Sequence, residues 1–226
     1  NMGKVPYRDF FDHHLPGAWY LSAVLQWFSA GSYVLFRIWW GIFTFACLLG
    51  VGMYIKRRKS DAFPYYMAYF FIYPFITVYY WTHLFIADSL AFLFFSVIFW
   101  LLVVETFQKE TSEKFIYILS FINFLFVFSS LTFIYVAGPF YLWMLYLLLR
   151  NKFEWKKLFK LVGLSILPYI LYGVYLFISN SWKEFYISNF LYNTKLYISI
   201  PNYVKGPHFN PLKFALTIIF NFYETY

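Results

Sequence analysis

Charged side chains are scarce in this chain of 226 residues. Asp, Glu, Lys and Arg make up only 12% of it, whereas about 25% is typical of a soluble domain. Hydrophobic residues make up 62% and occur in runs that are too long for a single core to bury. This composition excludes a disordered chain and a free-standing nucleic-acid binder. It predicts an integral membrane protein whose main partner is the lipid bilayer.

Cysteine is nearly absent as well, and so is the alternation of apolar and polar residues that marks a membrane β-barrel. Cys47 is the single cysteine, so the chain cannot be a disulfide-stapled scaffold. The apolar runs are continuous rather than alternating, which excludes a barrel and favours helices. The predicted fold class is therefore an all-α, polytopic integral membrane protein with a single transmembrane domain over residues 1–226.

Six apolar runs are long enough to predict membrane-spanning helices, since a span needs about 20 residues. A seventh run starts near Lys213 and reaches Tyr226. Because that run stops at the last residue, and no signal peptide precedes residues 1–32, we expect the chain to be a fragment that lacks an upstream helix and a C-terminal part. The six runs lie at about 33–55, 63–86, 88–104, 115–132, 134–149 and 159–179.

The basic residues predict the orientation of these helices. Eleven of the 18 Lys and Arg residues fall in three connections that share one side if each run crosses the membrane once. The positive-inside rule makes that side cytoplasmic, which predicts a plasma-membrane protein whose function lies on the extracytoplasmic face. The eleven are Lys56, Arg57, Arg58, Lys59, Lys109, Lys114, Arg150, Lys152, Lys156, Lys157 and Lys160.

The first outer segment, residues 1–32, carries the densest polar cluster. Asp9, Asp12, His13 and His14 precede the short apolar stretch 16–30, which predicts a helix lying along the outer membrane surface. Two carboxylates and two imidazoles this close together suit a general base with supporting groups, or a metal site. The alternative is that the acids cap turns while the histidines face solvent.

Other polar residues fall on the same predicted side. Asp88 opens the third run, where it either caps that helix or joins Asp9 around a substrate or cation. Arg37 lies one turn inside the first run and either snorkels to the headgroups or holds a phosphate with its planar guanidinium. Lys195 and Lys205 belong to the aromatic outer loop 180–212, whose rings suit contact with sugar or lipid.

The stretch from Gly3 to Gly17, GKVPYRDFFDHHLPG, resembles the first outer loop of GT-C membrane glycosyltransferases. The likeness is greatest to bacterial and archaeal relatives of the protein O-mannosyltransferases and of the aminoarabinose transferase that acts on lipid A. Members of that group follow a first span with a G-x-V-P-Y-x-D-F/Y pattern and a juxtamembrane helix. Arg37, the basic segment 56–59 and Asp88 continue the resemblance.

The resemblance implies a GT-C-like helical bundle and a transfer reaction. Such enzymes take a sugar from a polyprenyl-phosphate donor and pass it to a hydroxyl of a glycan, lipid or protein acceptor, usually with inversion. Asp9 matches the motif acid and is the expected catalytic base. Asp88 matches the second acid, which positions substrate or a divalent metal cation. The residues expected to contact substrate are Tyr7, Asp12, His13, His14, Arg37, Asp88, Lys195 and Lys205, and the candidate metal ligands are Asp88, Asp12 and His13.

A membrane protein without enzymatic activity is the alternative, for example a transporter or flippase of lipid-linked saccharides. Asp9 and Asp88 would then line a path. Transport sites usually lie near the bilayer midplane and use buried charges, whereas these acids gather at one face. The sequence therefore favours an active site open to the outer surface.

Overall fold

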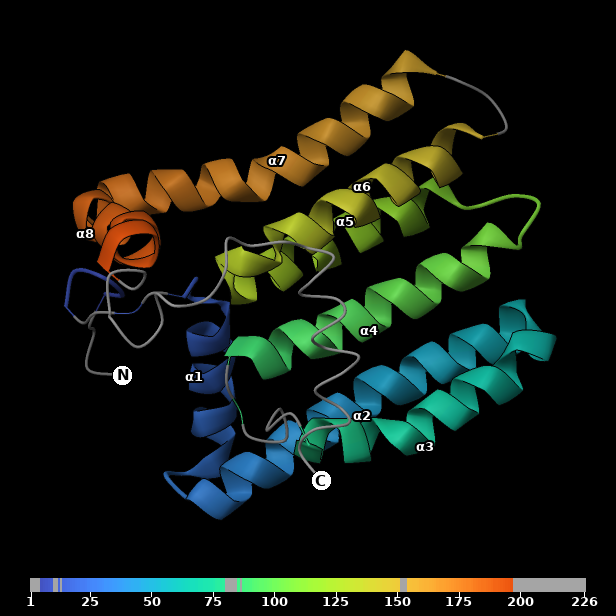
Figure 1. The fold of residues 1–226 in the computed structure, drawn as a ribbon, viewed down its shortest axis with the longest axis horizontal. Helices are drawn as coiled ribbons and strands as arrows, with labels where there is room; N and C mark the ends of the chain where they lie inside the picture. Colours follow the sequence, from blue (N-terminus) through green and yellow to red (C-terminus); the bar gives the residue numbers. More distant parts are fainter. Residues whose placement is uncertain are drawn as a thin grey trace.

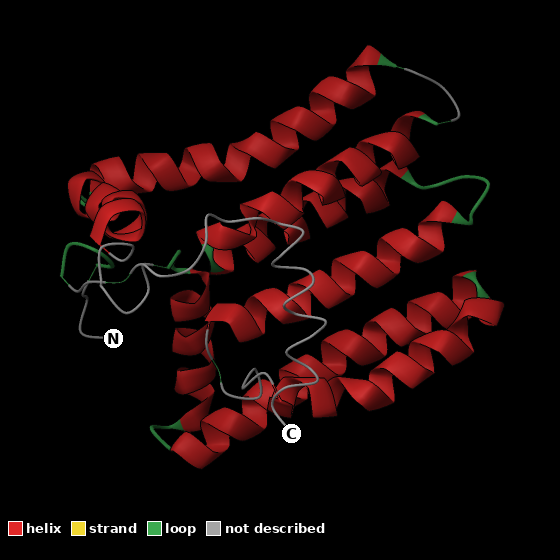
Figure 2. Cartoon of the chain, in the orientation of Figure 1, coloured by secondary structure: helices red, strands yellow, loops and turns green. Residues whose placement is uncertain are grey.

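The computed structural model describes residues 5–9, 12, 14–79, 85, 87–150 and 154–196 of the chain. These residues form helices and no β-strand (Figure 2), which confirms the all-α class for this part of the chain. The helices are α1 (Gly17–Ser29), α2 (Tyr33–Arg58), α3 (Phe63–Tyr79), α4 (Ala87–Thr106), α5 (Glu113–Ser129), α6 (Ile134–Leu149), α7 (Trp155–Ile178) and α8 (Trp182–Tyr186), followed by a π-helical segment, Ile187–Leu196.

Four helical segments are long and apolar enough to cross a membrane. They are Tyr33–Arg58, Ala87–Thr106, Leu131–Leu149 and Trp155–Ile178, in which the third joins a short 3-10 turn to α6. Helices also occupy the predicted runs 63–86 and 115–132, but α3 and α5 have only 17 residues each. The structure thus supports a multi-pass membrane protein with four such helices among the described residues. The seventh predicted run, 213–226, lies outside them.

The long helices lie side by side in a layered bundle with α4 near its centre (Figure 1). Leu93, Ile98 and Leu102 of α4 are fully buried, because α4 contacts α2, α5 and α6. On one flank, α3 packs on α2, and its Tyr69 hydroxyl donates to the Ser96 hydroxyl of α4 over 2.5 Å. On the other flank, α7 packs on α5 and α6. The outer faces of α2 and α7 stay largely uncovered and suit contact with lipid.

The three basic connections meet at one end of the bundle, which we call the basic end. Glu105 near the end of α4 is fully buried and accepts hydrogen bonds from Tyr54 and from Arg58 Nε, the latter over 3.2 Å. Arg150 at the end of α6 donates to the backbone oxygen of Thr106 over 3.0 Å. These contacts tie the ends of α2, α4 and α6 together. The prediction that the basic connections share one side is thereby confirmed.

Helix α1 lies at the opposite end, which we call the α1 end, and runs across the other helices rather than along them (Figure 1). It contacts α2, α4 and α5. Its first residue touches α5 so closely that a Cβ built on Gly17 would lie 2.6 Å from the backbone oxygen of Phe128. The turn from α1 into α2 uses left-handed backbone at Ala30 (φ 46°) and Gly31 (φ 82°). The short helix predicted over 16–30 is thus present.

Candidate functional site

The loop before α1 is held in place by Tyr7. This side chain is 4% exposed, and its hydroxyl donates to the backbone oxygen of His14 over 2.6 Å. Its ring packs edge-on against Phe185 of α8, with centroids 5.2 Å apart. Tyr7 has a φ of 68°, a region that bulky residues rarely adopt and that persists only when the surroundings enforce it. Tyr7, expected to contact substrate, is engaged with the protein itself.

Asp12 and His14 form a carboxylate–imidazole pair beside this anchor. Asp12 Oδ1 accepts from the backbone N–H of His14 over 2.9 Å and lies 3.0 Å from His14 Nδ1. The indole N–H of Trp19, one turn into α1, donates to Asp12 Oδ2. Each carboxylate oxygen therefore has a protein partner, which fixes the orientation of both the carboxylate and the imidazole.

The pair shifts the proton affinities of its members in opposite directions. Burial opposes ionisation of Asp12, but the hydrogen bonds from the ring and amide of His14 and from Trp19 outweigh it and lower the pKa of Asp12. The hydrogen bond to Asp12 raises the pKa of His14, and the charges of Asp12 and Asp88 add to that effect. The arrangement therefore favours an ionised Asp12 beside a basic imidazole.

The charge of Asp88 adds to the raised pKa of His14, and no hydrogen bond or ion pair among the described contacts joins the two side chains. Asp88 lies in the first turn of α4 and is exposed. The hydrogen-bonded pair of Asp12 and His14 in the loop before α1 is called here the acid–imidazole cluster. The described residues include no group of three or more His, Cys, Asp or Glu side chains that could hold a metal ion. His13, a candidate ligand, lies outside the part of the chain that the structure describes.

Asp9, the predicted base, has different partners. Its carboxylate pairs with the guanidinium of Arg8, with Arg8 Nε and Nη2 each 3.0 Å from a carboxylate oxygen. It also accepts from the backbone N–H of Val5 over 2.6 Å. This exposed pair raises the pKa of Arg8 through the hydrogen bond to Asp9. The structure thus places Asp9 in the same loop as the acid–imidazole cluster, with contacts of its own.

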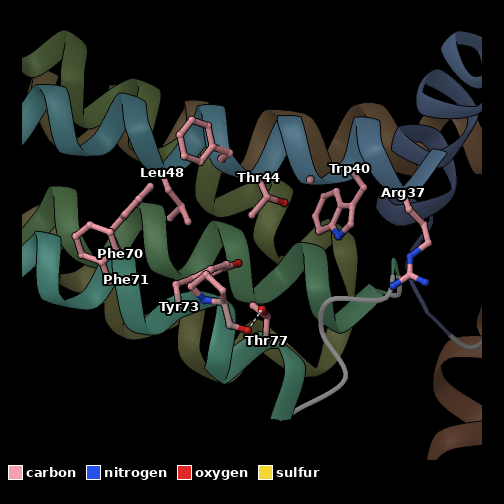
Figure 3. A pocket seen from close by; sticks show the side chains of 11 residues that line it. Arg37, Trp40, Thr44, Leu48, Phe70, Phe71, Tyr73 and Thr77 are labelled. Carbon is pink, nitrogen blue, oxygen red and sulfur yellow. Dashed lines mark hydrogen bonds between the residues drawn. The ribbon is translucent and has the colours of Figure 1, made fainter. Parts of the chain in front are cut away.

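Arg37 lies at the mouth of a groove between α2 and α3, called here the α2–α3 groove (Figure 3). The groove has a volume of about 440 Å³, within the range usual for ligand sites. The hydroxyl oxygen of Thr44 is buried in its wall without a hydrogen-bond partner among the described residues. The lining residues are Arg37, Trp40, Gly41, Thr44, Phe45, Leu48, Phe70, Phe71, Tyr73, Pro74 and Thr77.

The groove and the acid–imidazole cluster occupy opposite ends of α1. His14 precedes the first turn of this helix, whereas Arg37 lies in the second turn of α2, just after α1 ends (Figure 1). Thirteen residues of helix span about 20 Å. The structure therefore does not bring Arg37 to Asp12, whereas Phe85, three residues before Asp88, packs against Phe36 and Trp40 on either side of Arg37 in α2. Lys195 belongs to the π-helical segment, but its side chain lies outside the description, as does all of Lys205.

Sequence reasoning missed two contributors to these sites. Trp19 was assigned no role, although its spacing of seven residues from Asp12 places it within reach once the loop turns back on α1. The α2–α3 groove was also missed, because it depends on how two helices pack. The sequence offered one indication of the groove, the small residue Gly41 one turn after Arg37. In the structure, a Cβ built on Gly41 meets no atom within 4 Å.

Comparisons with protein-family models, with curated proteins and with solved structures found no match to this chain. The function of the protein is therefore inferred from its residues and their geometry, together with the resemblance of residues 3–17 to the GT-C loop.

Proposed function

We propose that this chain forms part of a GT-C-type membrane glycosyltransferase. It moves a sugar from a polyprenyl-phosphate donor to a hydroxyl of a glycan, lipid or protein acceptor, with inversion, at the α1 end of the bundle. In this proposal the α1 end faces the extracytoplasmic side of the plasma membrane and α1 lies along that surface. The observation that carries the proposal is the acid–imidazole cluster, in which Asp12 orients a proton-accepting imidazole at the end opposite the basic connections.

The chemistry needs a proton acceptor next to the acceptor hydroxyl. As the hydroxyl oxygen bonds to the anomeric carbon, its proton passes to the base, and the bond from that carbon to the phosphate oxygen breaks with its electron pair leaving on the phosphate. Cationic groups stabilise the charge that develops on the departing phosphate. Arg37, Lys195 and Lys205 are the cationic groups that the resemblance offers for this role.

Two residues can act as the base, and their surroundings differ. The resemblance assigns Asp9, whose carboxylate is paired with the guanidinium of Arg8. His14 is oriented by Asp12 through Nδ1, and when Nδ1 carries the proton, Nε2 carries the lone pair. Asp9 remains the base of the proposal, and His14 is the competing assignment that the experiment separates.

The test is transfer of a labelled sugar from polyprenyl-phosphate donors by membranes that contain the full-length protein. Asp9→Asn and His14→Gln are compared with Asp61→Asn, which changes an exposed acid at the basic end. We expect Asp9→Asn to abolish transfer, His14→Gln to reduce it, and Asp61→Asn to leave it unchanged. Transfer lost in His14→Gln but kept in Asp9→Asn would move the base to His14.

The donor range decides between enzyme and transporter. If several lipid-linked sugars are tested as donors and the unaltered protein transfers sugar from none of them, the glycosyltransferase proposal fails. Flux of those lipids across proteoliposomes is then the measurement that tests the transporter alternative.

A further inference from the structure

The α2–α3 groove opens on the outer surface of the bundle rather than toward its core, on a face of α2 that suits contact with lipid. Only 17% of the most apolar stretch of α2 is buried inside the protein, and the groove residues Phe45, Phe71 and Pro74 are exposed. Among the described residues that line the groove, Arg37 is the only cation. A lipid-facing groove that is apolar along its length and cationic at its mouth matches an anionic amphiphile.

The length of the groove matches one lipid leaflet. Arg37 and Leu48 are its first and last lining residues on α2, and eleven residues of helix rise about 16 Å. Half of the hydrocarbon core of a typical bilayer is about 15 Å. The walls at the middle of this length include Gly41, whose missing side chain leaves open space. The groove is therefore about as long as one acyl chain in a lipid leaflet.

We propose that the α2–α3 groove binds one anionic glycerophospholipid from the leaflet at the α1 end. Its phosphate lies on the guanidinium of Arg37, and one acyl chain runs along Gly41 toward Leu48. Between the two helices this acyl chain contacts Trp40 and Phe70, so the bound lipid fills the space between α2 and α3 and stabilises their packing. This proposal stands whether or not the protein is a glycosyltransferase.

The bound lipid is distinct from a reacting donor for two reasons. A phosphate on Arg37 lies at the end of α1 opposite to His14, about 20 Å of helix away, so it cannot share a reaction centre with the acid–imidazole cluster. A polyprenyl chain is also much longer than one leaflet is deep, whereas the groove ends at Leu48. The structure thus separates the lipid that supports the bundle from any lipid that reacts.

The experiment counts bound lipid on the purified full-length protein by native mass spectrometry. The protein in detergent is titrated with dioleoyl phosphatidylglycerol, and with dioleoylglycerol, which has the same chains but no phosphate. We expect one phosphatidylglycerol to bind above the background level and dioleoylglycerol to bind far more weakly. Equal binding of the two would remove the role of the phosphate and overturn the proposal.

Three variants locate the lipid. Arg37→Gln removes the charge and should weaken binding roughly tenfold or more, while Arg37→Lys should retain part of it. Gly41→Leu fills the groove and should abolish binding. Gly50→Leu is the matched control, because it adds the same side chain to the same helix in open space outside the groove. Its binding should equal that of the unaltered protein.

Two further outcomes would overturn the assignment. If Gly41→Leu and Gly50→Leu bind phosphatidylglycerol equally well, the lipid lies elsewhere. If an equimolar polyprenyl phosphate displaces phosphatidylglycerol from the unaltered protein, the groove is a donor site. Neither outcome depends on sugar transfer, so failure of the lipid proposal and failure of the proposed function are distinguishable.

Discussion

Replacing Gly17 with Ala should damage the α1 end while leaving the bundle intact. The added Cβ would lie 2.6 Å from the oxygen and 2.8 Å from the carbon of the Phe128 carbonyl, and 3.1 Å from the nitrogen of Ser129. All three are backbone atoms, so no side-chain rotation relieves the contact. The first turn of α1 must therefore move away from the end of α5.

The size of the effect follows from two opposing terms. Overpacking of this kind costs about 1–3 kcal/mol, and the higher helix propensity of Ala returns at most about 1 kcal/mol. We expect a net loss of about 1–2 kcal/mol. Because His14 and Asp12 precede this turn directly, a displacement of about 1 Å there can cost about 100-fold in rate.

The assay compares Gly17→Ala with Gly163→Ala in the full-length protein, by thermal unfolding in detergent and by sugar transfer. Gly163 lies inside α7, and a Cβ built on it meets no atom within 4 Å. This control should be neutral or stabilising in the unfolding assay. If Gly17→Ala is as stable as Gly163→Ala, the close approach of α1 to α5 is wrong.

Other regions give predictions of their own. Arg58→Gln should lower the free energy of unfolding by about 2–3 kcal/mol, because it leaves the charge of the buried Glu105 poorly compensated. The cost stays below that of a fully buried pair because Arg58 is 39% exposed. An unchanged denaturation midpoint would contradict this prediction. Thr44→Val should be neutral or stabilising by up to about 1 kcal/mol in the same assay, because it removes a buried hydroxyl that has no partner among the described residues. The lowered pKa of Asp12 contributes stability that is lost as pH falls through it, and the raised pKa of His14 contributes stability that is lost as pH rises through it. The difference in melting temperature between the unaltered protein and Asp12→Asn should therefore be widest between about pH 4 and about pH 6.5 and shrink on either side.

Much of the fold could be predicted because membrane helices are encoded locally. Long apolar runs and charged connections are visible in the sequence, and the structure confirms helices in all six runs and basic connections that meet at one end. The exact lengths could not be predicted. The first run was predicted to end at about 55, but α2 continues to Arg58, since apolar composition alone does not determine where a helix ends.

The candidate site was only partly predictable, because it depends on contacts between elements. The sequence identified Asp12, His14 and Asp88 as polar residues on one side, and the structure pairs His14 with Asp12. The partnership of Asp9 with Arg8 is local, yet no rule distinguishes it from a free carboxylate before the loop conformation is known. The separation of Arg37 from Asp12 follows from the direction of α1, which no spacing in the sequence specifies.

Helix α1 also has a mechanical consequence. A helix of three to four turns is stiff over its length, and this one carries the acid–imidazole cluster before its first turn and leads, through the Ala30–Gly31 turn, into the helix that holds Arg37. Helix α1 therefore connects the acid–imidazole cluster to the α2–α3 groove as one stiff element. Any ligand that tilts α1 at one end must strain or relax the packing at the other.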